Sequence, residues 1–152
     1  MFAGYFGDDA ATRQAMTDDG YLRTGDLGYS EPDNAFTYLQ RMSDTLRLSG
    51  FLVAPAEIET AVVDHPSVRD AQVVAVATPN GNRPVAFVVP ADGEVVDEAA
   101  IIAHVGGRLA KFKTPVRIIS VDAFPVTRSA NGTKIQRAKL RDMAEAAMRE
   151  VS

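Results

Sequence analysis

The sequence predicts an α+β fold: a small domain with a short, mainly antiparallel sheet flanked by helices, preceded by the tail of a larger N-terminal domain. Two observations predict it. Apolar runs of strand length alternate with stretches whose apolar residues recur at helical spacing. The opening segment, in contrast, cannot build a core on its own and is interpreted as the last piece of a larger domain. The length of 152 residues and the hydrophobic content of 46% fit one ordinary domain with an extra tail.

The opening segment is expected to hold a short helix at residues 8–16 and strands at 21–29 and 36–39, joined by turns. We place the domain boundary after residue 42. Residues 1–42 are then the end of the large domain, and residues 43–152 form the smaller domain.

The rest of the chain carries clearer signals. Pro55 suits the first turn of a helix, and Glu57 and Glu59 favour the positive end of its dipole. The apolar run at 70–78 predicts a buried strand that forms a hairpin with 85–89. The other elements expected are strands at 45–48, 51–53 and 116–121, a helix that begins at Asp97, and a last helix from about 136 to 150.

Composition excludes several kinds of site. The chain has no cysteine, so disulfides, thiolate metal sites and cysteine nucleophiles are excluded. His65 and His104 lie far apart in the sequence, and no metal site is expected. No apolar run approaches the roughly 20 residues that span a bilayer, and the N-terminus has no signal pattern. We therefore expect no transmembrane segment and a cytoplasmic protein.

Positive charge is concentrated near the C-terminal end. Residues 108–141 hold nine basic residues and one acid, which gives a net charge of +8. Because the whole chain has a net charge of −4, the rest of the chain carries −12. This asymmetry predicts an anionic partner, although a solvated helix face explains it equally well. The window has only two aromatic residues and matches no nucleic-acid module, so a phosphorylated small molecule fits better than nucleic acid.

One lysine in this window stands out. Lys134 follows a small and polar stretch that contains the turn signal Asn131-Gly132, and it precedes a helix. A lysine on such a loop can reach out of the domain and contact an anion. An exposed lysine without a function is the plain alternative.

Four stretches, in this order along the chain, resemble motifs of the adenylate-forming synthetases, which include acyl-CoA synthetases, luciferases and peptide-synthetase adenylation domains. Residues 21–28 contain Thr-Gly-Asp, and residues 41–59 resemble the hinge and the loop that follows it. Residues 109–115 resemble Leu-x-x-Tyr/Phe-Lys-x-Pro. Residues 124–137 resemble the last motif, which has a lysine before Ile-x-Arg. Together these stretches cover nearly the whole chain.

The resemblance implies that Lys134 is the catalytic lysine, which holds the acyl carboxylate and the α-phosphate during adenylation. A fixed cation between two negative groups offsets their repulsion, most strongly while the new bond forms. The family motif usually places Gly directly before this lysine. Here Thr133 intervenes after Gly132, which changes how the lysine approaches its target or is absorbed by the loop.

The resemblance also assigns nucleotide-binding and hinge residues. Asp26 would accept hydrogen bonds from the ribose hydroxyls, and Arg41 would also contact the ribose. Ser43 takes the hinge position, where the family usually has Asp or Lys. The alternatives are a turn-capping aspartate for Asp26, a surface ion pair with Asp44 for Arg41, and an ordinary loop serine for Ser43.

Contacts with CoA are implied at further positions. Gly50 would let the backbone approach the pantetheine arm, and a plain turn glycine is the alternative. Basic side chains are candidates for its phosphates: Lys111, Lys113 and Arg137.

The function implied is that of an acyl-CoA synthetase. It uses ATP and Mg²⁺ to form an acyl-adenylate from a carboxylic acid, with a fatty acid favoured and an aryl or alicyclic acid next, and CoA then displaces AMP. ATP and Mg²⁺ would bind through the large N-terminal domain of the same protein, whose phosphate loop and acyl pocket are not in this sequence. The fragment alone is therefore expected to be inactive. The alternatives are an adenylation domain that loads a carrier protein and a non-catalytic stand-alone binding module.

Overall fold

The computed structural model describes residues 4–32, 35–129 and 132–149, without the side chains of residues 27, 38–41, 43 and 129. The chain divides into two compact units, Met1–Asp44 and Thr45–Ser152. Within the described part of the chain, no helix has the length and apolar character needed to cross a membrane.

The first unit contains helix α1 (Asp9–Ala15), strands β1 (Asp26–Ser30) and β2 (Phe36–Arg41), and the 3-10 turn η1 (Met42–Asp44). Asp8 caps α1, because its Oδ1 accepts a hydrogen bond of 2.8 Å from the backbone N–H of Ala11. β1 and β2 pair antiparallel, with an irregularity between Leu27 and Gly28. None of the described side chains in this unit is buried, so these residues form no core of their own.

The second unit is built on a three-stranded sheet of β5 (Val68–Thr78), β6 (Gly81–Pro90) and β7 (Arg117–Ser120). β5 and β6 form the expected antiparallel hairpin, and β7 lies parallel to β6. Helix α3 (Glu98–Gly106) lies on the connection between these two parallel strands, as a crossover requires.

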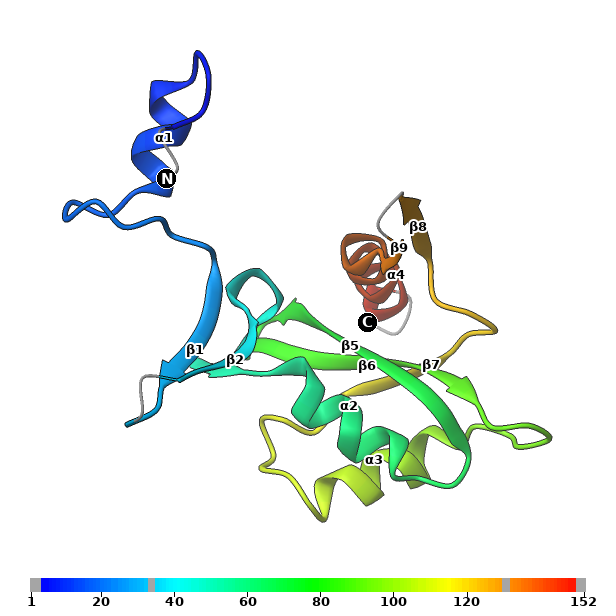
Figure 1. Cartoon of the computed structure of the whole chain (residues 1–152). Helices are drawn as coiled ribbons and strands as arrows, with labels where there is room; N and C mark the ends of the chain where they lie inside the picture. The colour runs from blue at the N-terminus through cyan, green and yellow to red at the C-terminus, as the bar shows by residue number, and fades with distance from the viewer. Residues whose placement is uncertain (1–3, 33–34, 130–131, 150–152) are drawn as a thin grey trace. The chain divides into compact units, whose positions relative to one another are not determined.

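Successive side chains of a strand point to opposite faces of a sheet. In this sheet the side chains on both faces are buried. Val73 and Val88 face a core that includes Ile58 of helix α2 (Pro55–Val63) and Ile101 of α3. On the opposite face, Phe87 belongs to a second core, completed by helix α4 (Arg137–Arg149). Figure 1 shows α2 and α3 on one side of the sheet and α4 on the other. This arrangement explains why the strand sequences read as nearly continuous apolar runs.

Two short hairpins complete the second unit. They consist of β3 (Leu46–Leu48) with β4 (Phe51–Val53), and β8 (Val126–Ser129) with β9 (Gly132–Ile135). The four helices and the short, mostly antiparallel sheets found in the described parts of the chain confirm the predicted α+β class. The expectation of a loop before the last helix was wrong at Lys134, which lies on β9. β-branched residues flank the turn there and favour paired strands: Val126, Thr127, Thr133 and Ile135.

Candidate functional site

Lys134 lies on β9 directly opposite Thr127 of β8, and its side chain is exposed. The side chain of Lys134 forms no hydrogen bond or ion pair with any residue that the structure describes. β9 begins at Gly132, which is paired with Ser129 and whose φ of 119° suits glycine; Asn131 lies outside the described residues. The lysine is thus presented on a paired strand with its ammonium group available to an anion.

Gln136 fixes the hairpin that carries this lysine. Its Nε2 donates to Thr127 Oγ1 at 2.7 Å and to the carbonyl of Val126 at 3.4 Å. Its backbone N–H also donates to the carbonyl of Pro125 at 2.8 Å. Ile135 packs against the second core and anchors the same strand. Sequence reasoning missed Gln136 and Thr127, although a polar side chain beside the lysine motif was a usable signal.

Arg137 begins α4 and is held by the body of the unit. Its Nη1 lies 3.4 Å from Glu59 Oε1 and donates to the carbonyl of Val73 at 3.3 Å. Glu59 also accepts a 3.0 Å hydrogen bond from the backbone N–H of Val73. Burial raises the pKa of Glu59 above its ordinary value, although the Val73 hydrogen bond and the Arg137 charge act in the opposite direction.

Lys113 is also paired with an acid. Its Nζ lies 2.6 Å and 2.9 Å from the two carboxylate oxygens of Glu57, and 5.8 Å from the centroid of the Phe112 ring. Phe112 stacks on Phe51 of β4, with ring centroids 5.1 Å apart. The loop before β7 is therefore joined to the β3–β4 hairpin and to the start of α2.

Gly50 forms the tip of the β3–β4 hairpin. The turn has two residues, Ser49 with φ of 49° and Gly50 with φ of 87°, between the paired residues Leu48 and Phe51. Two consecutive positive φ angles are typical of a type I′ turn. A Cβ atom built on Gly50 meets nothing within 4 Å, so open space adjoins the backbone at this position.

The first unit brings two of the predicted nucleotide-binding residues together. Asp26 at the start of β1 is paired in register with Arg41 at the end of β2. The backbone N–H of Met42 donates to the carbonyl of Gly25 at 2.8 Å and closes this end of the hairpin. Ser43 follows in η1. The side chains of Arg41 and Ser43 lie outside the described part of the structure.

The two histidines are far apart in sequence but adjacent in space, at the ends of α2 and α3. Their rings meet edge to face with centroids 5.2 Å apart, and His65 Nδ1 lies 2.8 Å from Ser67 Oγ. Burial, followed by the positive charge of Arg108, lowers the pKa of His104. Among the described residues, no group of three potential metal ligands is present.

The basic window is partly neutralised within the domain. Four of its nine basic residues pair with acids that precede the window: Arg108 with Asp64, Lys113 with Glu57, Arg117 with Glu98, and Arg137 with Glu59. Ion pairs within the domain thus neutralise part of the positive charge of residues 108–141. Lys134 is one of the basic residues of this window that form no ion pair with a described residue.

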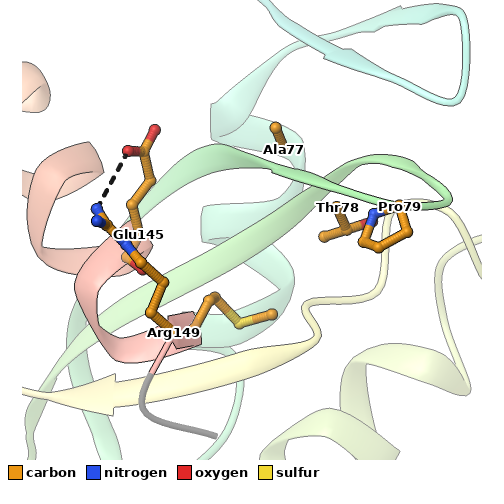
Figure 2. A pocket seen from close by; sticks show the side chains of 6 residues that line it. Ala77, Thr78, Pro79, Glu145 and Arg149 are labelled. Atoms are coloured by element: carbon orange, nitrogen blue, oxygen red, sulfur yellow. Dashed lines mark hydrogen bonds and ion pairs between the residues drawn. The ribbon is translucent and has the colours of Figure 1, made fainter. Parts of the chain in front are cut away.

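None of the predicted site residues lines the cavity of about 480 Å³ between the end of β5 and the C-terminal half of α4. Thr78 and Pro79 form one wall of it, and Glu145 and Arg149 form the other (Figure 2). These two charged groups lie 3.9 Å apart and compensate each other. The described residues that line this cavity therefore offer no unpaired charge to a ligand.

Comparison with known proteins gives a consistent result. Residues 57–131 match the family model described as the AMP-binding enzyme C-terminal domain. The chain is 33% identical over 142 residues to 4-coumarate-CoA ligase 1 of Narcissus pseudonarcissus, covering 93% of this chain and 25% of that protein. It is 39% identical over 141 residues to sulfoacetate–CoA ligase of Cupriavidus necator, covering 92% of this chain and 27% of that protein.

Among solved structures, ATP-bound MatB from Rhodopseudomonas palustris matches with a TM-score of 0.81 and 35% identity. The match covers 94% of this chain and 28% of that one. The chain thus spans about a quarter of the length of the curated relatives that it matches.

Proposed function

Because this chain belongs to the AMP-binding enzyme C-terminal domain family, we propose that it is the C-terminal part of an ATP-dependent acyl-CoA synthetase. The larger protein would convert a carboxylic acid to an acyl-adenylate and then transfer the acyl group to CoA. The observation that carries this proposal is Lys134, an exposed lysine without a described partner on a hairpin that Gln136 holds in place.

Lys134 would bind the acyl carboxylate and the α-phosphate together. Adenylation brings two negative groups into contact, and a cation fixed by a paired strand reduces their repulsion without reorganisation during the reaction. Thr133, the residue inserted after Gly132, is paired with Arg128 in the hairpin. This pairing supports a hairpin that absorbs the additional residue, with Lys134 opposite Thr127.

Asp26 and Arg41 would bind the ribose of the nucleotide. Their register pairing supports this role, because it places a carboxylate, which accepts hydrogen bonds, and a guanidinium, which donates them, on neighbouring residues of two strands. Ser43 in η1 would serve as the hinge. Mg²⁺ would be bound by the large N-terminal domain of the same protein; the described residues of this chain contain no cluster of potential metal ligands.

CoA would approach Gly50, where nothing lies within 4 Å of an added Cβ atom. Lys113 and Arg137 are held by Glu57 and Glu59. A CoA phosphate would therefore have to compete with these carboxylates for the two cations.

The acid would be selected by an acyl pocket in the large N-terminal domain of the same protein. We propose a fatty acid first and an aryl or alicyclic acid second. The relatives named above are ligases of 4-coumarate and sulfoacetate by name, so the test panel must include aromatic and short acids.

The test is made on the complete protein that contains this chain. Its native mass comes first, because a mass equal to that of the 152 residues would support a stand-alone binding module instead. The acid panel is then assayed for acid-dependent exchange of pyrophosphate into ATP and for acyl-CoA. Exchange without thioester formation on free CoA, but with loading of a carrier protein, would favour the alternative adenylation domain. No exchange with any acid would refute the proposal.

A further inference from the structure

Thr127 and Lys134 project from the same face of the β8–β9 hairpin. They lie directly opposite each other in the antiparallel register, and the side chains of such a pair share one face, with Cβ atoms about 4.5–5.5 Å apart. Both side chains are exposed. The neighbouring pair, Arg128 and Thr133, projects to the other face, because side chains alternate along a strand. An anion that contacts the Lys134 ammonium group from this face can therefore also reach the Thr127 hydroxyl.

Gln136 determines the direction of the hydrogen bond that Thr127 forms. Its Nε2 lies 2.7 Å from Thr127 Oγ1 and 3.4 Å from the carbonyl oxygen of Val126. A carbonyl oxygen can only accept, so the amide group of Gln136 must direct its nitrogen, and not its oxygen, toward these two atoms. Because an amide nitrogen only donates, Thr127 Oγ1 is the acceptor in this bond. The proton of the Thr127 hydroxyl is thus left for another acceptor.

The described part of the chain supplies no acceptor for that proton. The bond from Gln136 is the only side-chain hydrogen bond that Thr127 forms with a described residue. Two unused donors, the Lys134 ammonium group and the Thr127 hydroxyl, thus lie on one face of one hairpin. A phosphate has several oxygens and can accept from both donors at once. Because Gln136 holds the hydroxyl before the anion arrives, the entropic cost of this contact is reduced.

We propose that the Thr127 hydroxyl is a second catalytic donor, which donates a hydrogen bond to a non-bridging oxygen of the α-phosphate that Lys134 binds. Gln136 is then a positioning residue, because it acts by holding the hydroxyl in the donating orientation. This inference rests on the proposed function and adds a donor to its first step. The phosphate is the better target, because the attacking carboxylate oxygen loses negative charge as the new bond forms. A donor to that oxygen would stabilise the ground state more than the bond-forming state.

The test uses the complete protein, with pyrophosphate exchange for the first step and release of AMP from preformed acyl-adenylate by CoA for the second. Thr127→Val keeps the β-branched shape and removes the hydroxyl. It should slow exchange about tenfold or more, as expected for one lost hydrogen bond to a charged group, and leave the second step within about twofold. An unchanged second step also shows that the variant is folded. Thr127→Ser, which restores a hydroxyl, should recover most of the exchange rate.

Thr133→Val is the matched control. Thr133 is an exposed threonine directly before Lys134, and it projects to the other face of the hairpin. Loss of its hydroxyl should leave both steps unchanged.

Double substitutions separate a direct contact of Thr127 from a structural role. Gln136→Met removes the amide at nearly the same side-chain length and should slow exchange about as much as Thr127→Val. The two substitutions together should be no slower than either alone, because Gln136 acts through Thr127. In Lys134→Ala, Thr127→Val should still slow the residual exchange severalfold. A threonine that only holds the lysine in place would have no further effect there.

The proposal is overturned if the unmodified protein exchanges pyrophosphate and Thr127→Val exchanges it equally fast, or if Thr127→Ser is as slow as Thr127→Val. It is also overturned if Thr127→Val has no effect in Lys134→Ala. Additive effects of Thr127→Val and Gln136→Met would exclude the positioning role of Gln136. Absence of exchange in the unmodified protein would instead refute the proposed function, and this inference with it, so the two failures are distinguishable.

Discussion

Arg137, the first residue of α4, forms a partly buried ion pair with Glu59 of α2, with 3.4 Å between Nη1 and Oε1. The two residues are 78 positions apart in the sequence. The same guanidinium group donates to the carbonyl of Val73 on β5. The pair therefore joins α4 to both α2 and the sheet, at the point where the chain leaves the hairpin that carries Lys134.

Arg137→Ala should therefore destabilise the second unit. Truncation leaves the half-buried Glu59 carboxylate without its counter-charge, and the expected loss is about 1–3 kcal/mol in the free energy of unfolding. Urea denaturation measures it. Arg141→Ala, which removes an exposed arginine of the same helix, is the control and should change stability by less than about 0.5 kcal/mol. Equal effects of the two substitutions would rule out a structural role for Arg137.

Glu59→Gln should change the pH dependence of stability. The pKa of Glu59 is raised in the folded state above its ordinary value of 4.5, so the folded state binds this proton more readily. The stabilisation that protonated Glu59 contributes to the free energy of unfolding is fully present below about pH 4.5. It is lost as the pH rises through the pKa of Glu59 in the folded state. Glutamine has no such titration and can still accept the Val73 hydrogen bond.

The stability of Glu59→Gln relative to the unmodified protein should therefore rise between pH 4.5 and pH 7. Urea denaturation at several pH values in this range measures the difference. A difference that stays constant with pH would contradict the assignment of burial as the dominant cause of the raised pKa.

Much of the second unit could be predicted from local signals. Pro55 with the acids that follow marks the start of α2, and the long apolar run followed by Pro79 to Asn82 marks the β5–β6 hairpin. Such signals involve residues that are close in sequence, so they can be recognised without knowledge of the tertiary structure.

The partners of the basic residues could not be predicted in the same way. Lys113 and Glu57 are 56 positions apart, and only the packing of the loop before β7 against α2 brings them together. The contact between His65 and His104 arises similarly, from the meeting of two helix ends. The β8–β9 hairpin was missed because its small and polar residues lack the alternation of apolar and polar side chains that marks a half-buried strand.

Gly50→Ala should destabilise the β3–β4 hairpin by about 1 kcal/mol, because the residue has φ of 87°. No steric clash contributes, since nothing lies within 4 Å of the added Cβ atom. Gly107→Ala is the matched control. Gly107 has φ of −76°, which alanine adopts freely, so this variant should be neutral or more stable. Thermal unfolding of both variants tests the prediction, and equal destabilisation would contradict it.

Lys134→Ala in the complete protein is the most direct test of the proposed chemistry. The side chain is exposed and has no described partner, so its removal should leave the free energy of unfolding within about 0.5 kcal/mol of the unmodified value. Acyl-adenylate formation should nevertheless fall by a factor of about 100 or more, since a charge that stabilises the bond-forming state is lost.

Thioester formation from a preformed acyl-adenylate should be much less affected by Lys134→Ala, because the carboxylate and the phosphate are by then already joined. Pyrophosphate exchange reports the first step, and release of AMP on addition of CoA to the preformed adenylate reports the second. Lys139→Ala, at an exposed lysine of α4 in the same basic window, should leave both rates unchanged. Equal loss of the two steps in Lys134→Ala would indicate a general defect in the site, and loss of neither would exclude this lysine from catalysis.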